Sequence, residues 1–326
     1  MKMKRYDIYY TLVGVLVGLL IGVVGLKYSK NYLFKQTIYS IGIYTGESPY
    51  SFNNPNNIKN PILTAKDITD VPAIYVADPF IIKDYLNWYM FFEVVNKNSK
   101  QGDIGLAISN DGTNWKYKQI ILDEPFHLSF PYVFKWKNDY YMVPESTEAN
   151  SIRLYRANNF PFQWTYIGDM LQGNDFLDTS ILRYNDKWWL FTTTSLRNNI
   201  LRLYYSEDLK GPYKEHIKSP IVRGNAHIAR SGGRMIVHNG HIIRYAQDDN
   251  PTYGNKLWAF KITELTATTY KEEKVSDNPV LKASGSGWNK DGMHQIDPYQ
   301  VGEKNWIAFV DGKRTTLVFG ADNRFP

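Results

Sequence analysis

The strongest constraint on the fold is a pattern that recurs five times between Asp78 and Asp311. Each copy holds a short extended run, a polar or glycine turn, and an aromatic-rich strand that often ends in a carboxylate. The copies span residues 77–93, 130–145, 178–191, 229–245 and 296–311. Strand-built repeats of roughly 40–50 residues are typical of β-propellers. The sequence therefore predicts an all-β fold, a five-bladed β-propeller whose polar strand ends meet at one central funnel.

A separate strand is expected before the first copy. Residues 37–44 alternate between apolar and polar side chains as strands do, and residues 53–60 are rich in Asn and Pro and predict a loop. This strand can complete the last blade beside residues 315–319, which removes an exposed sheet edge. We therefore assign residues 31–36 to a connector and residues 37–326 to the propeller.

The first thirty residues predict a membrane anchor. Residues 11–26 carry no charge, and residues 8–26 are about long enough to span the apolar core of a bilayer. Basic residues flank this run, and tyrosines lie near both predicted interfaces. A cleaved signal peptide is the alternative, but the run is long for one and no Ala-x-Ala site follows. We expect residues 1–30 to form a single-pass anchor, with the N-terminus in the cytoplasm and the propeller outside it.

Glycines recur every four residues in this segment, at Gly14, Gly18 and Gly22. On a helix they form one stripe along which a second helix can approach closely. Glycine is also common in membrane spans generally. A homodimer formed through this stripe is therefore a hypothesis that needs its own test.

Composition excludes several classes of site. The chain has no cysteine, which excludes disulfides, thiol catalysis, Cys-zinc sites and iron–sulfur clusters. The net charge of +6 is spread along the chain without a Lys/Arg block, so no nucleic-acid partner is expected. No recognised metal motif is present, and we expect no metal and no cofactor. Aromatic residues make up 15% of the chain, which suits packed strands and also sugar binding.

Four short motifs carry a resemblance to a known family. They read Ile-Gly-Ile-Tyr-x-Gly, Asn-Pro-Ile-Leu-Thr, Val-Ala-Asp-Pro-Phe and Val-Pro-Glu-Ser, in this order. The ordered set resembles the N-terminal propeller of glucosamine inositolphosphorylceramide transferases, which is related to the propellers of glycoside hydrolase families 43 and 32. The resemblance covers residues 37–320. Plant members carry a separate C-terminal transferase domain that has no counterpart in this sequence, so the family name alone does not assign a reaction.

The resemblance to the hydrolase propellers implies catalytic carboxylates. It places a catalytic Asp at Asp78 in the first blade, and a second Asp, which tunes the acid or stabilises the transition state, at Asp178 in the third. Glu145 follows a very apolar strand, a setting that raises a carboxyl pKa as a general acid requires. Glycosidic cleavage needs a proton donor and a second carboxylate, so we predict Asp78, Glu145 and Asp178 as catalytic. The structural alternatives are a carboxylate that accepts backbone N–H groups, a strand-end charge and an Asx turn, respectively.

The fourth blade departs from the hydrolase pattern. Where the hydrolases usually have their acid Glu, this chain has Arg230. A guanidinium group suits phosphate or carboxylate, which predicts an anionic group in the ligand, such as a sugar nucleotide, a lipid phosphate or a uronic acid. An ion pair with Asp178 or Asp297 is the structural alternative. The predicted substrate-binding residues are Arg230, Arg244, Gln247, His294 and Asp297, with Tyr253 and Gly254 on a loop at the rim.

Three functions remain open at this point. The first is a membrane-anchored carbohydrate-active enzyme that hydrolyses or transfers sugar on a glycan or glycolipid, with a glycan, glycolipid or sugar nucleotide as partner. The second is a non-catalytic glycan-binding propeller in surface-polysaccharide assembly, which the missing fourth-blade acid keeps open. The third is a scaffold that uses its blade edges and the glycine stripe. The sequence favours the first, without deciding between hydrolysis and transfer or naming the sugar.

Overall fold

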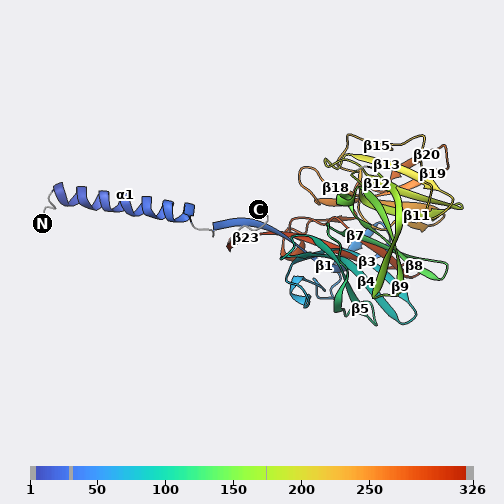
Figure 1. The fold of residues 1–326 in the computed structure, drawn as a ribbon, viewed down its shortest axis with the longest axis horizontal. Coiled ribbons are helices and arrows are strands. Elements are labelled where there is room, and N and C mark those ends of the chain that lie inside the picture. Colours follow the sequence, from blue (N-terminus) through green and yellow to red (C-terminus); the bar gives the residue numbers. More distant parts are fainter. Residues whose placement is uncertain (1–4, 29–31, 174, 321–326) are drawn as a thin grey trace. The chain divides into compact units, whose positions relative to one another are not determined.

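The computed structural model describes residues 5–28, 32–173 and 175–320 (Figure 1). The chain forms two compact units, which we describe separately. One consists of Met1–Thr37 and Thr315–Pro326, and the other of Ile38–Arg314. The first unit contains helix α1 (Arg5–Tyr28) and the outer ends of two long strands, β1 (Tyr32–Ser48) and β23 (Asn305–Gly320). These strand ends are tied by a hydrogen bond of 3.2 Å between the hydroxyls of Thr37 and Thr315.

Helix α1 covers the segment for which the sequence predicts an anchor. In the described part of the chain, no helix combines the length and the apolar character that a membrane crossing requires. The anchor therefore stays a prediction. A Cβ atom added at Gly14, Gly18 or Gly22 would meet no heavy atom within 4 Å, and the dimer through this stripe also stays a prediction.

The two predicted boundaries next to the propeller fall partly outside the described residues. Strand β1 already begins at Tyr32, so residues 32–36 of the predicted connector are strand. Residue 31 of the connector and residues 321–326 of the predicted propeller lie outside the described residues, as do residues 1–4 and 29–30 of the predicted anchor.

The second unit is a five-bladed β-propeller, as the sequence predicts. Blades 1 and 2 each have four strands in chain order. Blade 1 contains β3 (Ala73–Asp84), β4 (Asn87–Asn96), β5 (Gly102–Ser109) and β6 (Lys116–Leu122). Blade 2 contains β7 (Ser129–Trp136), β8 (Asp139–Glu145), β9 (Ser151–Asn159) and β10 (Gln163–Gln172). Blade 3 contains β11 (Leu177–Tyr184), β12 (Lys187–Thr193), β13 (Ile200–Ser206), β14 (Lys214–Glu215) and β15 (Val222–Arg223). All neighbouring strands within these blades run antiparallel.

Blades 4 and 5 are less regular. Blade 4 contains β16 (Arg230–Ser231), β17 (Ile236–His238), β18 (His241–Asp248), β19 (Lys256–Leu265), β20 (Tyr270–Lys274) and β21 (Leu281–Lys282). Blade 5 has the order β2-β1-β23-β22, with β2 (Ser51–Asn53) and β22 (Ile296–Gly302) at its two edges. Blade 5 therefore combines strands from the two ends of the propeller sequence. Three short 3₁₀ helices lie in the connections, at Ala65–Asp67, Thr147–Ala149 and Gly287–Asn289.

Aromatic side chains fill the space between adjacent blades. Phe80 of blade 1 packs against Phe130 and Tyr132 of blade 2, with ring centroids 4.9 Å and 5.1 Å apart. On the other side of the same blade, Trp88 packs against Tyr299 of blade 5 at 5.0 Å. Each ring buries a large apolar surface in a dense interface. This explains why so many aromatic residues recur in the strands.

Candidate functional site

The inner strands of blades 1, 2 and 3 are each interrupted by an irregularity. In β3, β7 and β11 the register with the next strand shifts at residues 77–80, 129–132 and 177–180, which marks a β-bulge. One residue at each shift has a positive φ angle: Asp78 (52°), Phe130 (45°) and Asp178 (42°). Non-glycine residues adopt this conformation at an energetic cost, and such positions gather at functional sites. The bulges fix Asp78 and Asp178 at equivalent positions in blades 1 and 3.

Arg230 binds two of the three predicted catalytic carboxylates. Its Nε donates to Asp178 Oδ2 at 2.7 Å, and its Nη2 donates to Asp178 Oδ1 at 3.2 Å and to Glu145 Oε2 at 3.5 Å. Gln247 Nε2 donates to Asp178 Oδ2 at 2.6 Å. The side chains of Asp178, Glu145 and Arg230 are 3%, 10% and 12% exposed. We call Glu145, Asp178, Arg230 and Gln247 the Arg230 cluster.

The two carboxyl groups of this cluster have opposite protonation preferences. Burial, followed by the charge of Asp178, raises the pKa of Glu145 to about 8. Burial acts in the same direction on Asp178, but Arg230 and a hydrogen bond with Glu145 outweigh it and hold the pKa of Asp178 below its usual value. At neutral pH the pair therefore carries one proton, on Glu145. One carboxyl group can then donate a proton while its neighbour stays anionic, as in acid-base catalysis.

A second cluster forms around His294, just before β22. His294 Nδ1 donates to Asp311, with Oδ2 at 2.7 Å, and the same nitrogen is 4.0 Å from Asp78 Oδ1. Burial lowers the pKa of His294, but Asp311 and Asp78 outweigh this effect and raise the pKa to about 9. The imidazole is therefore a buried cation at neutral pH. We call Asp78, His294 and Asp311 the His294 cluster.

Asp78 also accepts a backbone N–H group, which is the structural role that the sequence offered as the alternative to catalysis. Its Oδ2 accepts the backbone N–H of Phe130 at 3.2 Å, and its own N–H donates to Asp311 Oδ2 at 3.2 Å. Burial raises the pKa of Asp78 well above its usual value, and the charge of His294 opposes that rise. Asp78 thus links blades 1, 2 and 5 while its second oxygen faces the imidazolium.

The His294 cluster has the donor atoms of a metal site. The nitrogen of His294 and the oxygens of Asp78 and Asp311 lie within 4.8 Å of one another. These are ligand types that divalent cations accept. The short contact between His294 and Asp311 already pairs two of the three, so we assign this group as an ion pair.

Two aromatic rings pack on His294, and one of them, Tyr253, also contacts Arg230. Tyr39 stacks on His294 with centroids 4.8 Å apart, and Tyr253 meets the same ring edge-on at 5.2 Å. The guanidinium carbon of Arg230 lies 5.1 Å from the centroid of the Tyr253 ring. Tyr253 is 40% exposed, so part of this residue is open to solvent beside Arg230 and His294. Sugar rings pack on aromatic faces of this kind, because one face of a sugar is largely C–H.

Arg244 and Asp297 do not join these clusters. Arg244 is 1% exposed, and its Nε and Nη2 donate to Glu272 at 2.8 Å and 2.7 Å. Asp297 instead pairs with Arg234, whose Nε lies 2.6 Å from Oδ1. Their charges are matched within the fold. The role of these two residues in substrate binding stays a prediction, and their present contacts are ion pairs with Glu272 and Arg234.

Sequence reasoning missed several members of the site. Glu93, Glu145 and Asp311 each lie six residues after the first residue of the strand that follows β3, β7 or β22 in blades 1, 2 and 5, yet only Glu145 was predicted. Glu93 is buried and lies 3.1 Å from His127 Nε2, and its charge acts on Asp78. The carboxylate that recurs in the repeat was the available signal. Once Glu145 is assigned to the site, the repeat also predicts Glu93 and Asp311 as site residues.

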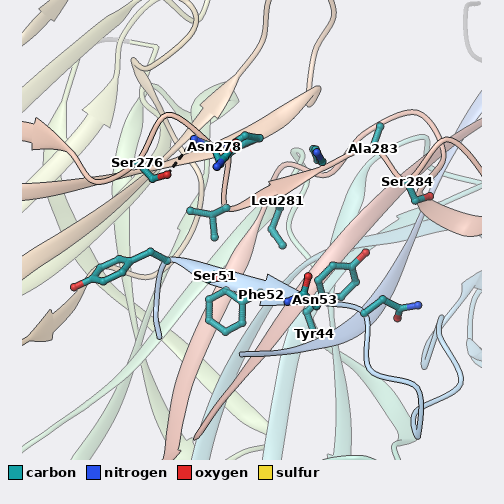
Figure 2. A pocket seen from close by; sticks show the side chains of 14 residues that line it. Tyr44, Ser51, Phe52, Asn53, Ser276, Asn278, Leu281, Ala283 and Ser284 are labelled. Atoms are coloured by element: carbon teal, nitrogen blue, oxygen red, sulfur yellow. Dashed lines mark hydrogen bonds between the residues drawn. The ribbon is translucent and has the colours of Figure 1, made fainter. Parts of the chain in front are cut away.

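A separate pocket lies between β2 and residues 276–284 (Figure 2). Its volume is about 390 Å³. Phe52 lies on one side of it and Leu281 on the other, and Asn53 and Asn278 add amide groups. No residue of the Arg230 or His294 cluster lines this pocket. It combines apolar surface with hydrogen-bonding groups, as sites for small polar molecules do.

Comparison with known proteins defines the family. Residues 34–313 match the family described as glucosamine inositolphosphorylceramide transferase 1, N-terminal. The chain belongs to this family. It is 37% identical over 298 residues to glucosamine inositolphosphorylceramide transferase 1 of Oryza sativa subsp. japonica, and 34% identical over 302 residues to that of Arabidopsis thaliana. The matches cover 85% of this chain but 40% and 39% of these relatives, so the chain spans about two fifths of their length.

Solved structures share the fold at low sequence identity. A β-1,2-mannobiose phosphorylase from Listeria innocua has a TM-score of 0.61 and 15% identity, with 83% of this chain and 97% of that chain covered. A glycoside hydrolase family 62 α-L-arabinofuranosidase from Coprinopsis cinerea has a TM-score of 0.57 and 10% identity, with 82% and 96% covered. These likenesses show the propeller architecture. The family assignment comes from the sequence matches alone.

Proposed function

We propose that this protein is a carbohydrate-active enzyme that acts on a glycan or glycolipid containing an amino sugar, at the Arg230 and His294 clusters. The observation that carries the proposal is the adjacent pair of Glu145 and Asp178, one protonated and the other ionised at neutral pH. Membership of a family named for a glucosamine transferase supports the sugar class. The contact of Arg230 with both carboxylates and with the ring of the partly exposed Tyr253 supports the location of the site.

In the proposed reaction Glu145 donates its proton to the leaving oxygen of the sugar donor, so that the leaving group departs as a neutral hydroxyl. Positive charge then develops at the sugar carbon and ring oxygen, and the ionised Asp178 stabilises it. An acceptor hydroxyl attacks that carbon and gives its proton to Asp78. The acceptor is water in hydrolysis and a second sugar or lipid headgroup in transfer, and the family name supports transfer.

The contacts of Arg230 change the ligand chemistry that the sequence suggested. Its guanidinium already donates to Asp178, Glu145 and Asn198. Most of its N–H groups are therefore occupied, and its charge is matched by carboxylates. A site rich in acceptors favours ligands that bring donors. The hydroxyl and amino groups of a glucosamine unit meet this requirement better than a phosphate does.

The test is a reaction screen on the full chain with Glu145→Gln as the variant. Chromogenic glycosides of glucosamine and N-acetylglucosamine report hydrolysis, and the same sugars on a nucleotide, with an inositol phospholipid as acceptor, report transfer. Loss of a general acid costs about 10²–10⁴-fold in rate. Glu207→Gln, at a carboxylate that is 86% exposed, is the matched control and should keep full activity. Equal rates for both variants would refute the role of Glu145.

Glycan binding without catalysis is the second candidate, and the pocket in Figure 2 favours it. This pocket is lined by Phe52, Leu281 and nearby amide groups, and it shares no residue with the Arg230 or His294 cluster. A binding module would keep its affinity for sugars in Glu145→Gln and lose it in Phe52→Ala. Turnover by the unmodified chain in the screen above would rule out a purely binding role.

We also propose that residues 8–26 anchor the protein in a membrane with the propeller outside the cytoplasm. The support is the uncharged run and its basic and aromatic flanks. Carbonate extraction of membranes should leave the full chain in the pellet, whereas Leu16→Arg should release it, because a charge near the centre of a span costs about 2.5–3.5 kcal/mol. Recovery of the unmodified chain in the soluble fraction would contradict the proposal. Cross-linking of Gly18→Ile, compared with the parent chain, tests the glycine stripe separately.

A further inference from the structure

Asp249 follows directly on strand β18 and begins the loop that carries Tyr253. Its backbone N–H donates to Ala226 O at 3.0 Å, and its Oδ1 accepts the N–H of Gly254 at 2.8 Å. The first bond ties the backbone of Asp249 to the connection between β15 and β16, and the second ties its side chain to Gly254 in its own loop. The other carboxylate oxygen, Oδ2, is buried and has no hydrogen-bond partner among the described residues.

The unpartnered oxygen belongs to a carboxylate within the field of both clusters. The charges that act on Asp249 come from Arg230 of β16, His294 before β22 and Asp178 of β11. The charge of Asp249 in turn acts on Lys313 of β23 and on Tyr39 of β1. Burial raises the pKa of Asp249, and Arg230 opposes that rise. Charged or polar groups of blades 3, 4 and 5 therefore interact electrostatically with this carboxylate.

The neighbouring Asp248 shows what a structural carboxylate looks like in the same place. Its Oδ1 lies 2.8 Å from His227 Nδ1, and its Oδ2 accepts from Trp258 Nε1 at 3.0 Å and lies 3.6 Å from Lys256 Nζ. Both of its oxygens have partners that hold β18, β19 and a loop together. Asp249 has a partner for one oxygen only. A buried acceptor without a partner destabilises the folded protein, so the contacts within the fold do not explain this oxygen of Asp249.

We propose that Asp249 is a ligand-binding residue, whose Oδ2 accepts a hydrogen bond from a hydroxyl or amino group of the bound sugar while the ring of Tyr253, on the same loop, packs against the sugar face. The inference rests on the proposed function, because it assigns the ligand of the same site. It also gives the fourth blade a site carboxylate on the loop after β18, in place of one on its first strand.

Two measurements on the full chain test the assignment, with Asp249→Asn as the variant and Asp248→Asn as the matched control. Asn keeps an oxygen for the Gly254 N–H and removes the buried charge. Thermal unfolding should therefore show a melting temperature equal to or above that of the parent for Asp249→Asn, and below it for Asp248→Asn. Calorimetric titration with the methyl glycosides of glucosamine and N-acetylglucosamine should show binding that is weaker by about tenfold or more in Asp249→Asn.

The outcomes separate this inference from the proposed function. Sugar binding by the parent chain that persists unchanged in Asp249→Asn overturns the inference and leaves the proposed function standing. A melting temperature that falls as far in Asp249→Asn as in Asp248→Asn also overturns it, because the residue would then be structural. Absence of binding by the parent chain overturns both. Weaker binding together with an undiminished melting temperature supports the assignment.

Discussion

Replacement of Arg230 by Met is the sharpest test of how the site is held together. The substitution keeps an unbranched side chain but removes the cation that contacts Asp178 and Glu145. Asp178 is 3% exposed and would lose both bonds to the guanidinium. A buried carboxylate that loses its partner is far less stable than the intact pair.

The expected loss is about 3–5 kcal/mol, the usual cost of breaking a buried ion pair from one side. For a domain of this size about 2–4 °C of melting temperature corresponds to each kcal/mol, so the melting temperature should fall by roughly 6–20 °C. The loss should depend on pH. Because Arg230 holds the pKa of Asp178 low, the stabilisation is present above the unfolded pKa of about 3.9 and is lost as pH falls through the folded value. In Arg230→Met burial alone raises that pKa, so the variant loses stability as pH rises.

The difference in melting temperature between the parent and Arg230→Met should therefore increase with pH when thermal unfolding is measured from about pH 4 to about pH 8. Lys187→Met is the control, because Lys187 pairs with Glu207, which is 86% exposed, and such surface pairs contribute about 0–1 kcal/mol. The double variant Arg230→Met with Asp178→Asn should recover part of the loss, since it removes the stranded charge. A small, pH-independent gap in Arg230→Met, equal to that in Lys187→Met, would refute the reasoning.

Three further outcomes follow from the structure. Turnover should decline as pH rises through about 8, because Glu145 then loses the proton that it donates; a rate that stays level across that pH contradicts its role as the acid. Gly233→Ala, at φ 137° and against the backbone of Ile296, should prevent stable folding, whereas Gly240→Ala, at φ 75° with no atom within 4 Å, should cost only about 1–3 kcal/mol in thermal unfolding. Ile43→Ala, at a fully buried position in β1, should cost about 2–5 kcal/mol in denaturant unfolding, and a near-zero change would mean that β1 is dispensable.

The repeat predicted the blades because alternation and turn chemistry are local properties of the chain. The resemblance to hydrolase propellers indicated Asp78 and Asp178, which open the first and third copies of the repeat. The repeat did not indicate which face of β18 each side chain occupies, because this blade departs from the common spacing. Arg244 and Gln247 are an odd number of residues apart on β18, and successive side chains on a strand point to opposite faces. Gln247 contacts Asp178, and Arg244 consequently faces Glu272.

Other members of the site could not be read from a local pattern. The contact between Asp78 and Asp311 joins the first and last copies of the repeat, and only closure of the ring brings them together. Asp249 lies in a loop between two strands, where periodicity carries no information about direction. Its significance comes from what its Oδ2 lacks, which is a property of the folded surroundings. The positive φ angles at Asp78 and Asp178 are likewise set by the bulges and not by residue type.

The place of β1 next to β23 has a consequence for biosynthesis. The first strand pairs with β2 early, but its other neighbour, β23, is available only when nearly all of the chain has been translated. Until then blade 5 lacks its inner strands, and one edge of β1 remains open to wrong pairing. Contacts of such long sequence separation slow folding. The nascent chain should therefore depend on chaperones late in synthesis, and a truncation just before β23 should yield an aggregating product instead of a four-bladed one.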